Sequence, residues 1–559
     1  MIRRTTDERI LEGMSCMDAK RNELLVIGDS GVMPYLLPLL QESEVPACSA
    51  VFLSDEPYPP AGTLFPGTET GLIEGRSVSR NQEEREWKET IGAYPVILLA
   101  LSSLDLILYR KIFNVCAAGG KILLPAAFAR GLGLLGPMTA RRSDACLESA
   151  WRRLHVPDAD NAGSADNADN AGIPCIPGIP GNKGNQASPG SDRDAPPSSL
   201  LYSILSNVMV HYAELYLETR SLQLHNQVYV FHEAALEGRI YPVERHPLAG
   251  GSPATGSSPA APIWVPLSGA AVHAAKDEMD LEALYSLLAR LASPHTGILY
   301  ELDEGDFIQL PLSVCRSQST DPLAPGPAGK LPAALCAGYT HWEARREAGL
   351  TGLQAYTARL AERLCPSDHG SGQTCIGVGT TYPEAIGRAL QSCLEEKAGL
   401  HGRQSGAAVF PIRLGEVKDP RCSYYLQSLN QLAGKWELYW SEGAAAAPVI
   451  WVHADSKWYA ACDLNLTYAL RRVLVRALLD LQTGFGRDSG TTTGITAVAG
   501  TEWDIPQAEE NYQAEDVKEM LTRLANAQWS VETADLAVEE FMSELCVYGV
   551  RLKGGQDYE

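Results

Sequence analysis

The first part of the chain alternates short apolar runs with segments of helical periodicity. Four apolar runs have the length of buried strands: residues 22–31, 48–55, 94–103 and 121–128. Residues 34–45 and 105–120 repeat apolar positions at helical spacing, and two glycines end the second segment. Strands and helices in alternation predict a parallel, doubly wound sheet, so we expect an α/β Rossmann-like domain here.

Two low-complexity stretches divide the sequence. Residues 158–199 and 248–262 are rich in small, polar and helix-breaking residues, which cannot bury enough apolar surface to offset the entropy of ordering. We expect a disordered linker in the first stretch and a flexible linker in the second. The first part of the Rossmann-like domain then spans residues 1–157.

The remaining segments differ in pattern. Residues 200–247 hold an amphipathic helix followed by two strand-like runs, which we expect to complete the N-terminal half by extending its sheet. Residues 263–559 mix helices and short strands without strict alternation, which predicts an α+β domain.

An internal repeat lies in this last segment. The pattern G-x-T-x-x-E-A occurs at Gly338 and again at Gly379. Thr340 with Glu343, and Thr381 with Glu384, have the spacing of a capping box, in which each side chain satisfies the other residue's backbone N–H. Each copy therefore predicts a helix start, and residues 463–482 predict a third amphipathic helix.

Charge and composition narrow the functional classes. The net charge of −22 argues against a nucleic-acid or anionic-membrane partner, because phosphate-binding surfaces need clustered Lys and Arg; a short basic peptide is a plausible ligand. No apolar run is long enough to span a bilayer, and acidic residues interrupt the first 20 positions where a signal peptide needs an apolar stretch, so we expect a cytoplasmic protein. The 13 cysteines form no C-x-x-C, which predicts neither a disulfide framework nor a structural zinc site.

The turn after the first strand has part of a nucleotide-binding loop. Gly28 and Gly31 are present, but Ser30 and Met33 stand where a G-x-G-x-x-G loop needs glycine. Asp55 ends the next strand, where a ribose-binding acid would lie, although Asp is also common in turns at strand ends. Nucleotide binding by Gly28, Gly31 and Asp55 is one hypothesis, and a purely structural turn is the other.

The segment after residue 115 resembles the ThiF/E1-like fold. Gly133, Gly136 and Pro137 match the G-x-x-G-P strand of that family. Its C-x-x-C pair binds zinc, whereas Ser149 follows Cys146 at the paired position here. The resemblance therefore implies a Rossmann core that has lost its metal site.

The repeat resembles the YcaO fold of azoline-forming cyclodehydratases, in which helix carboxylates hold the Mg²⁺ ions that bridge ATP phosphates. The positions of the aligned family motifs are Glu347, Thr351 and Gln354 on the first helix, Ser392, Glu395, Glu396 and Lys397 on the second, and Asp480 on the third. Only Glu395 and Asp480 stand where the family has acids. Two carboxylates are too few for several Mg²⁺ ions, so we expect neither ATP nor Mg²⁺ as a cofactor.

Together the two halves resemble the ocin-ThiF-like family, whose proteins take part in the maturation of thiazole-containing bacteriocins. The resemblance implies a non-catalytic partner that binds the leader of a ribosomal precursor peptide and brings it to a separate ATP-dependent YcaO cyclodehydratase. The resemblance also implies a further partner, an FMN-dependent azoline dehydrogenase. We further expect that the chain can form a homodimer. Only 22 residues precede the first strand, too few for the winged-helix element that grips leaders in this family, so leader binding would need another surface or another chain.

Two alternatives stay open. The first is an active fused cyclodehydratase whose ATP-Mg²⁺ site is rebuilt from the acids of the ELDEGD segment, Asp303, Glu304 and Asp306; an exposed turn explains the same acids. The second is a nucleotide-dependent Rossmann enzyme, which the incomplete glycine loop disfavours.

Overall fold

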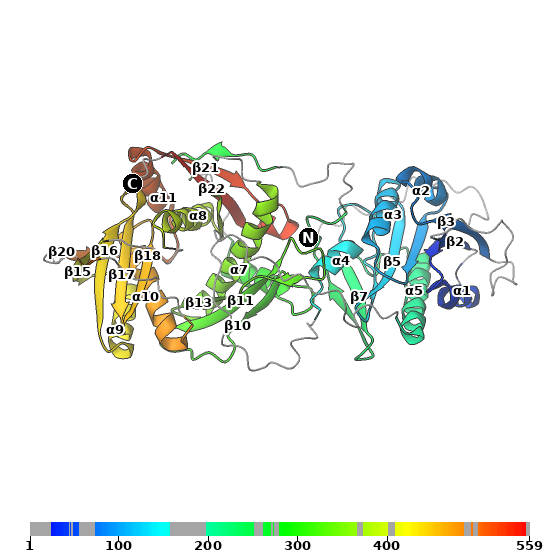
Figure 1. Ribbon diagram of the computed structural model, residues 1–559, viewed down its shortest axis with the longest axis horizontal. Helices are drawn as coiled ribbons and strands as arrows, with labels where there is room; N and C mark the ends of the chain where they lie inside the picture. The colour runs from blue at the N-terminus through cyan, green and yellow to red at the C-terminus, as the bar shows by residue number, and fades with distance from the viewer. Residues whose placement is uncertain are drawn as a thin grey trace, which may run out of the picture. The chain divides into compact units, whose positions relative to one another are not determined.

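The computed structural model divides into two compact units (Figure 1). It describes residues 24–43, 45, 48–54, 73–156, 197–250, 261–269, 272, 279–365, 373–400, 408–485, 494–495 and 501–554. Unit 1 comprises Met1–Glu148, Pro189–Glu244 and Gly250–Thr255, and unit 2 comprises Ser149–Ser188, Arg245–Ala249 and Gly256–Glu559. Asp55 and most of both predicted linkers lie outside the described residues.

Unit 1 is built on an eight-stranded sheet in the order β3-β2-β1-β4-β5-β6-β7-β8. The strands are β1 (Leu24–Gly28), β2 (Cys48–Ser54), β3 (Ile73–Ser79), β4 (Val96–Leu101), β5 (Ile122–Ala129), β6 (Leu132–Leu135), β7 (Gln227–His232) and β8 (Glu237–Pro242). The first five pair in parallel and the last three antiparallel. The predicted mixed α/β class with a parallel sheet is confirmed, and residues 227–242 extend the sheet as expected.

Helices cover the centre of this sheet because strands β1, β4 and β5 are buried and apolar on both faces. They are α1 (Met33–Glu42), α2 (Glu84–Ile91), α3 (Leu106–Ala118), α4 (Leu147–Arg153), which ends in unit 2, and α5 (Ser199–Thr219). Alternate strand residues, among them Val26, Leu98 and Ala126, form one buried cluster with α1 and α5. The short polar helix α2 and strand β3 were not predicted.

Unit 2 is a mixed assembly of three sheets and six longer helices within the described part of the chain. One sheet joins β10 (Leu299–Asp303), β11 (Ser313–Asp321), β12 (Gly329–Lys330) and β13 (Ala334–Gly338). A second has the order β14 (Cys375–Gly379), β22 (Cys546–Gly554), β21 (Trp529–Asp535), β9 (Val265–Pro266). The third joins β18 (Lys457–Cys462), β17 (Pro448–Ala454), β16 (Trp436–Glu442), β15 (Ala408–Val417), β19 (Gly494–Ile495) and β20 (Thr501–Ile505). The helices are α6 (Leu281–Leu291), α7 (His341–Leu364), α8 (Tyr382–Lys397), α9 (Pro420–Leu432), α10 (Leu466–Thr483) and α11 (Ala514–Asn526).

Both repeat copies begin helices, as predicted. The Thr340 side chain accepts the N–H of Glu343 at the start of α7 (3.2 Å), and the Thr381 side chain accepts the N–H of Glu384 at the start of α8 (3.3 Å). In a capping box the glutamate side chain would accept the N–H of the cap residue itself. Here each glutamate instead accepts the N–H of the residue before the cap, Tyr339 (3.0 Å) or Thr380 (2.9 Å). The third predicted helix is α10.

The glycines before α8 let this helix lie directly on strand β14. A Cβ added to Gly377 would lie 1.8 Å from the carbonyl oxygen of Ala385, and one added to Gly379 would lie 2.8 Å from the Ala385 nitrogen. The glycine-rich segment therefore serves close packing between strand and helix.

None of the helices in the described ranges combines the length and apolar character needed to cross a membrane.

Candidate functional site

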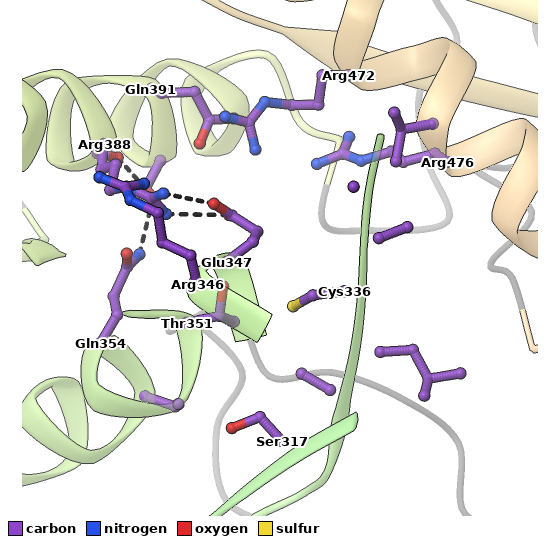
Figure 2. A pocket seen from close by; sticks show the side chains of 18 of the residues that line it. Ser317, Cys336, Arg346, Glu347, Thr351, Gln354, Arg388, Gln391, Arg472 and Arg476 are labelled. Atoms are coloured by element: carbon purple, nitrogen blue, oxygen red, sulfur yellow. Dashed lines mark hydrogen bonds and ion pairs between the residues drawn. The ribbon is translucent and has the colours of Figure 1, made fainter. Parts of the chain in front are cut away.

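Unit 2 contains a cavity of about 580 Å³ bordered by α7, α8, α10 and the β11–β13 region (Figure 2). Its wall includes Glu347, Thr351 and Gln354 from α7 and Ser392 and Glu395 from α8. These are positions at which the YcaO resemblance places metal-site motifs. Residues far apart in the sequence thus meet at one cavity, which makes it the candidate functional site.

The other predicted residue of this half, Asp480, is not part of the cavity wall. Its buried carboxylate Oδ2 accepts hydrogen bonds from Lys457 Nζ (2.7 Å) and from the Tyr459 hydroxyl (2.5 Å). One turn earlier on α10, Arg476 lines the cavity instead. Of the two aligned acids, the structure brings only Glu395 to the site.

Every carboxylate that lines the cavity forms an ion pair with an arginine. The pairs are Glu343 with Arg421, Glu347 with Arg388, Glu362 with Arg359, Glu384 with Arg346, Glu395 with Arg476, Asp463 with Arg472 and Glu510 with Arg421. Guanidinium groups therefore balance the carboxylate charge throughout the wall.

Glu395 is held by two donors of one guanidinium. Arg476 Nη1 lies 2.9 Å from Glu395 Oε1, and Nη2 donates to Oε2 at 2.9 Å. The backbone N–H of Cys462 adds a bond to Oε1 (3.3 Å), and Arg476 Nη1 also donates to the Ala460 carbonyl (2.5 Å). This carboxylate is buried behind its arginine.

Glu347 and Glu384 share Arg388. Its Nη1 donates to Glu347 Oε1 (3.0 Å), its Nη2 to Glu347 Oε2, and its Nε to Glu384 Oε1 (3.2 Å). Burial acts to raise the pKa of Glu347, but the charge and hydrogen bonds of Arg388 outweigh it and lower that pKa to about 2. For Glu384, burial is likewise outweighed by Arg388 and Arg346, so its pKa is lowered. Both groups are carboxylates at neutral pH.

Asp463 precedes α10 and contacts both Arg472 and Tyr512. Arg472 Nε donates to Asp463 Oδ2 (2.9 Å), and the Tyr512 hydroxyl donates to Oδ1 (2.8 Å). Burial raises the pKa of Asp463 because it outweighs the opposing effect of Arg472. This acid, too, is fully engaged by protein donors.

Mg²⁺ bound to a nucleotide needs carboxylate oxygens that face it and are free of competing cations. The lining carboxylates lack that freedom. Across the described segments, no group of three or more His, Cys, Asp and Glu residues is placed to hold a metal ion. The residues present therefore do not fit the Mg²⁺-ATP group that the YcaO fold implies.

The acids of the ELDEGD segment lie elsewhere. Asp303 ends β10, Glu304 and Asp306 follow it in a largely exposed turn, and none of the three is part of the cavity wall. The Gly305 N–H bonds to Asp303 Oδ1 (2.8 Å), and Glu304 Oε1 lies 3.3 Å from His341 Nδ1. In this arrangement they supply no rebuilt site at the cavity.

In unit 1, the carboxylate of Asp29 occupies the partial glycine loop. It is buried and accepts hydrogen bonds from the N–H of Gly31 (3.2 Å), the N–H and hydroxyl of Ser102 (2.8 and 2.9 Å) and Arg80 (3.1 Å). A Cβ on Gly28 would lie 2.7 Å from the sulfur of Met33. N–H groups of the kind that a loop offers to a phosphate thus bind the chain's own carboxylate. Nucleotide binding by Gly28 and Gly31 stays a prediction, and Asp55 lies outside the described residues.

The sequence interpretation missed the arginines that complete the site. Arg388, Arg472 and Arg476 come from two helices, and each pairs with an acid at least four positions away in sequence. The available signal was the pair of arginines one turn apart on the strongly amphipathic segment 463–482, where one face was expected to be buried.

Comparison with known proteins supports the fold. No protein-family model matches this chain, and no curated protein matches it. A solved structure described as a heterocyclase in complex with substrate and cofactor superimposes with a TM-score of 0.54 over 96% of this chain and 81% of its own, at 11% sequence identity. This chain shares the fold of that heterocyclase structure. The heterocyclase TruD aligns with a TM-score of 0.49 at 13% identity over 96% of this chain and 80% of its own. The E. coli MccB structure with MccA-N7isoASN has a TM-score of 0.27 at 11% identity and covers 41% of this chain and 66% of its own.

Proposed function

We propose that this chain is a non-catalytic partner in the biosynthesis of a thiazole- or oxazole-modified ribosomal peptide. It pairs a ThiF/E1-like half with a degenerate YcaO-like half. It binds a precursor peptide and brings it to a separate ATP-dependent YcaO cyclodehydratase, which forms the azoline rings.

One observation carries the non-catalytic part of this proposal: every carboxylate of the cavity wall is paired with an arginine. Activation of an amide by ATP needs Mg²⁺ to neutralise the phosphates, and Mg²⁺ needs carboxylates that are not already neutralised. The heterocyclase fold supports the part that concerns modified peptides. An FMN-dependent azoline dehydrogenase would then oxidise the azoline rings. The chain would also form a homodimer, which light scattering tests.

A reconstitution separates this role from a fused enzyme. The precursor peptide and Mg²⁺-ATP are incubated with this chain alone, with the YcaO cyclodehydratase of the same organism alone, and with both proteins. Mass spectrometry then measures the loss of one water per ring. We expect ring formation only, or far faster, with both proteins. Ring formation by this chain alone would establish the fused enzyme instead.

A further inference from the structure

On the α10 side of the cavity, the arginine side chains are partly exposed and the carboxylates that pair with them are buried. The side chains of Arg472 and Arg476 are 31% and 32% exposed, whereas those of their partners Asp463 and Glu395 are each 1% exposed. The two arginines lie one helical turn apart, and Figure 2 shows them entering the cavity from the same helix. A ligand in the cavity therefore meets the cationic half of each pair.

Both guanidinium groups keep a donor for a ligand. Arg472 uses Nε for Asp463 (2.9 Å) and Nη2 for the Tyr512 hydroxyl (3.0 Å). Arg476 uses Nη1 for Ala460 (2.5 Å) and Nη2 for Glu395 (2.9 Å). Within the described residues this leaves Arg472 Nη1 and Arg476 Nε without a hydrogen-bond acceptor.

Other parts of the wall are apolar. Leu331 and Leu335 border the cavity beside β12 and β13, Ala358 borders it from α7, and Val475 and Leu479 border it from α10. The volume of about 580 Å³ lies in the range of small-molecule sites, whose walls are mostly apolar with a few polar groups that fix orientation.

We infer that this cavity binds a ligand that carries an oxyanion on an apolar body, and that Arg472 and Arg476 hold the oxyanion without a divalent cation. The planar guanidinium matches the geometry of carboxylate and phosphate oxygens, and it stays protonated at every physiological pH. The apolar side chains bury the body of the ligand. The oxyanion can be a carboxylate of a peptide or a phosphate of a small metabolite, because both offer the same oxygens.

This inference goes beyond the partner role and does not depend on it. The reconstitution above measures ring formation, whereas a binding measurement on the isolated chain tests the cavity. Failure of one therefore leaves the other standing.

The test is a calorimetric titration of the full chain in the presence of EDTA. Three probes are compared: N-acetyl-leucine as a carboxylate on an apolar body, N-acetyl-leucinamide as its uncharged match, and pyrophosphate as the phosphate form. We expect an oxyanion probe to bind at least tenfold more tightly than the amide. Tighter binding of N-acetyl-leucine assigns a carboxylate ligand, and tighter binding of pyrophosphate assigns a phosphate. Equal affinity of acid and amide together with no binding of pyrophosphate would overturn the inference.

Variants locate the bound probe. Glu395→Gln with Arg476→Gln, and separately Asp463→Asn with Arg472→Gln, remove each pair without leaving a buried charge. The matched control is Arg290→Gln with Glu544→Gln, an exposed ion pair (2.6 Å) away from the cavity wall. Either cavity variant should weaken oxyanion binding at least tenfold with an unchanged circular dichroism spectrum, and the control should bind like the unmodified chain. Unchanged binding in a folded cavity variant would place the probe elsewhere and refute the assignment.

Discussion

Arginine is the partner of buried carboxylates outside the cavity as well. In unit 2, Arg153 Nη2 contacts Glu539 Oε2, and the Tyr356 hydroxyl donates to Glu539 Oε1 (2.6 Å). Arg153 Nη2 also donates to the Arg245 carbonyl (3.0 Å). All three side chains are buried. Such a network contributes little net stability relative to apolar residues, but removal of one member leaves an uncompensated charge.

Arg153→Met should therefore lower the free energy of unfolding by about 3–5 kcal/mol, because Glu539 is left charged and buried. A second substitution, Glu539→Gln, should restore part of that loss. Urea denaturation of the single and double variants measures both effects. A single variant as stable as the unmodified chain would show that the pair is not formed.

His155 predicts a pH dependence of stability. Its Nε2 lies 2.9 Å from the Gly297 carbonyl oxygen, and burial lowers its pKa from 6.5 to about 4. A group whose pKa is lower in the folded state contributes stability above its unfolded pKa, and that contribution is lost as the pH falls toward the folded pKa. About 3 kcal/mol should be lost between pH 6.5 and about 4 through this residue.

His155→Gln should flatten the dependence of the unfolding free energy on pH in this window, since the glutamine amide does not titrate. The exposed His211→Gln is the control and should keep the slope of the unmodified chain. Urea titrations at several pH values measure it. The same slope in both variants would contradict a neutral, buried His155.

At the scale of elements, the packing of α8 on β14 fixes one side of the cavity. Gly377→Ala should destabilise unit 2 by about 1–3 kcal/mol or more, because the new Cβ would lie 1.8 Å from the Ala385 carbonyl oxygen and 2.7 Å from the Ala389 nitrogen. Gly434→Ala is the control, because its nearest neighbour is the Asp455 side chain at 3.5 Å. Thermal unfolding compares the two. A Gly377→Ala variant with the stability of the control would show that α8 does not approach β14 this closely.

Elements with a strong apolar pattern could be predicted from the sequence, and others could not. The buried strands β1, β4 and β5 and helices α7, α8 and α10 follow periodicity and capping residues. Helix α2 and strand β3 could not be predicted, because their sequences, EREWKETI and IEGRSVS, are mostly polar. Strand β3 forms through its parallel pairing with β2.

The candidate site could likewise be predicted only in part from the sequence. Glu347, Thr351, Gln354, Ser392 and Glu395 were located by motif resemblance, and the structure brings them together. The pairs of Arg388 with Glu347 and of Arg476 with Glu395 join different helices, and local sequence does not encode such contacts. Asp29 was overlooked because a single acid in a turn has no pattern, and its role follows from its contact with Ser102.

At the scale of the whole molecule, the structural likeness to the heterocyclase extends over 96% of the chain, while Glu395, the aligned acid at the cavity, is paired with Arg476. The net charge of −22 does not contradict an oxyanion site, since the partly exposed Arg472 and Arg476 each pair with a buried acid. A cavity wall whose carboxylates are paired with arginines supports the proposed role, in which this chain positions a peptide for another enzyme.

One titration directly tests the claim that the cavity carboxylates cannot hold Mg²⁺ for ATP. ATP is added to the purified chain in a calorimeter, once with Mg²⁺ and once with EDTA, and both titrations are repeated after the precursor peptide has been added. Because arginine pairs occupy the carboxylates, we expect Mg²⁺ to leave the affinity for ATP unchanged within twofold, with or without the peptide. Micromolar binding that requires Mg²⁺ would show that the carboxylates are available to the metal, and it would return catalysis to this chain.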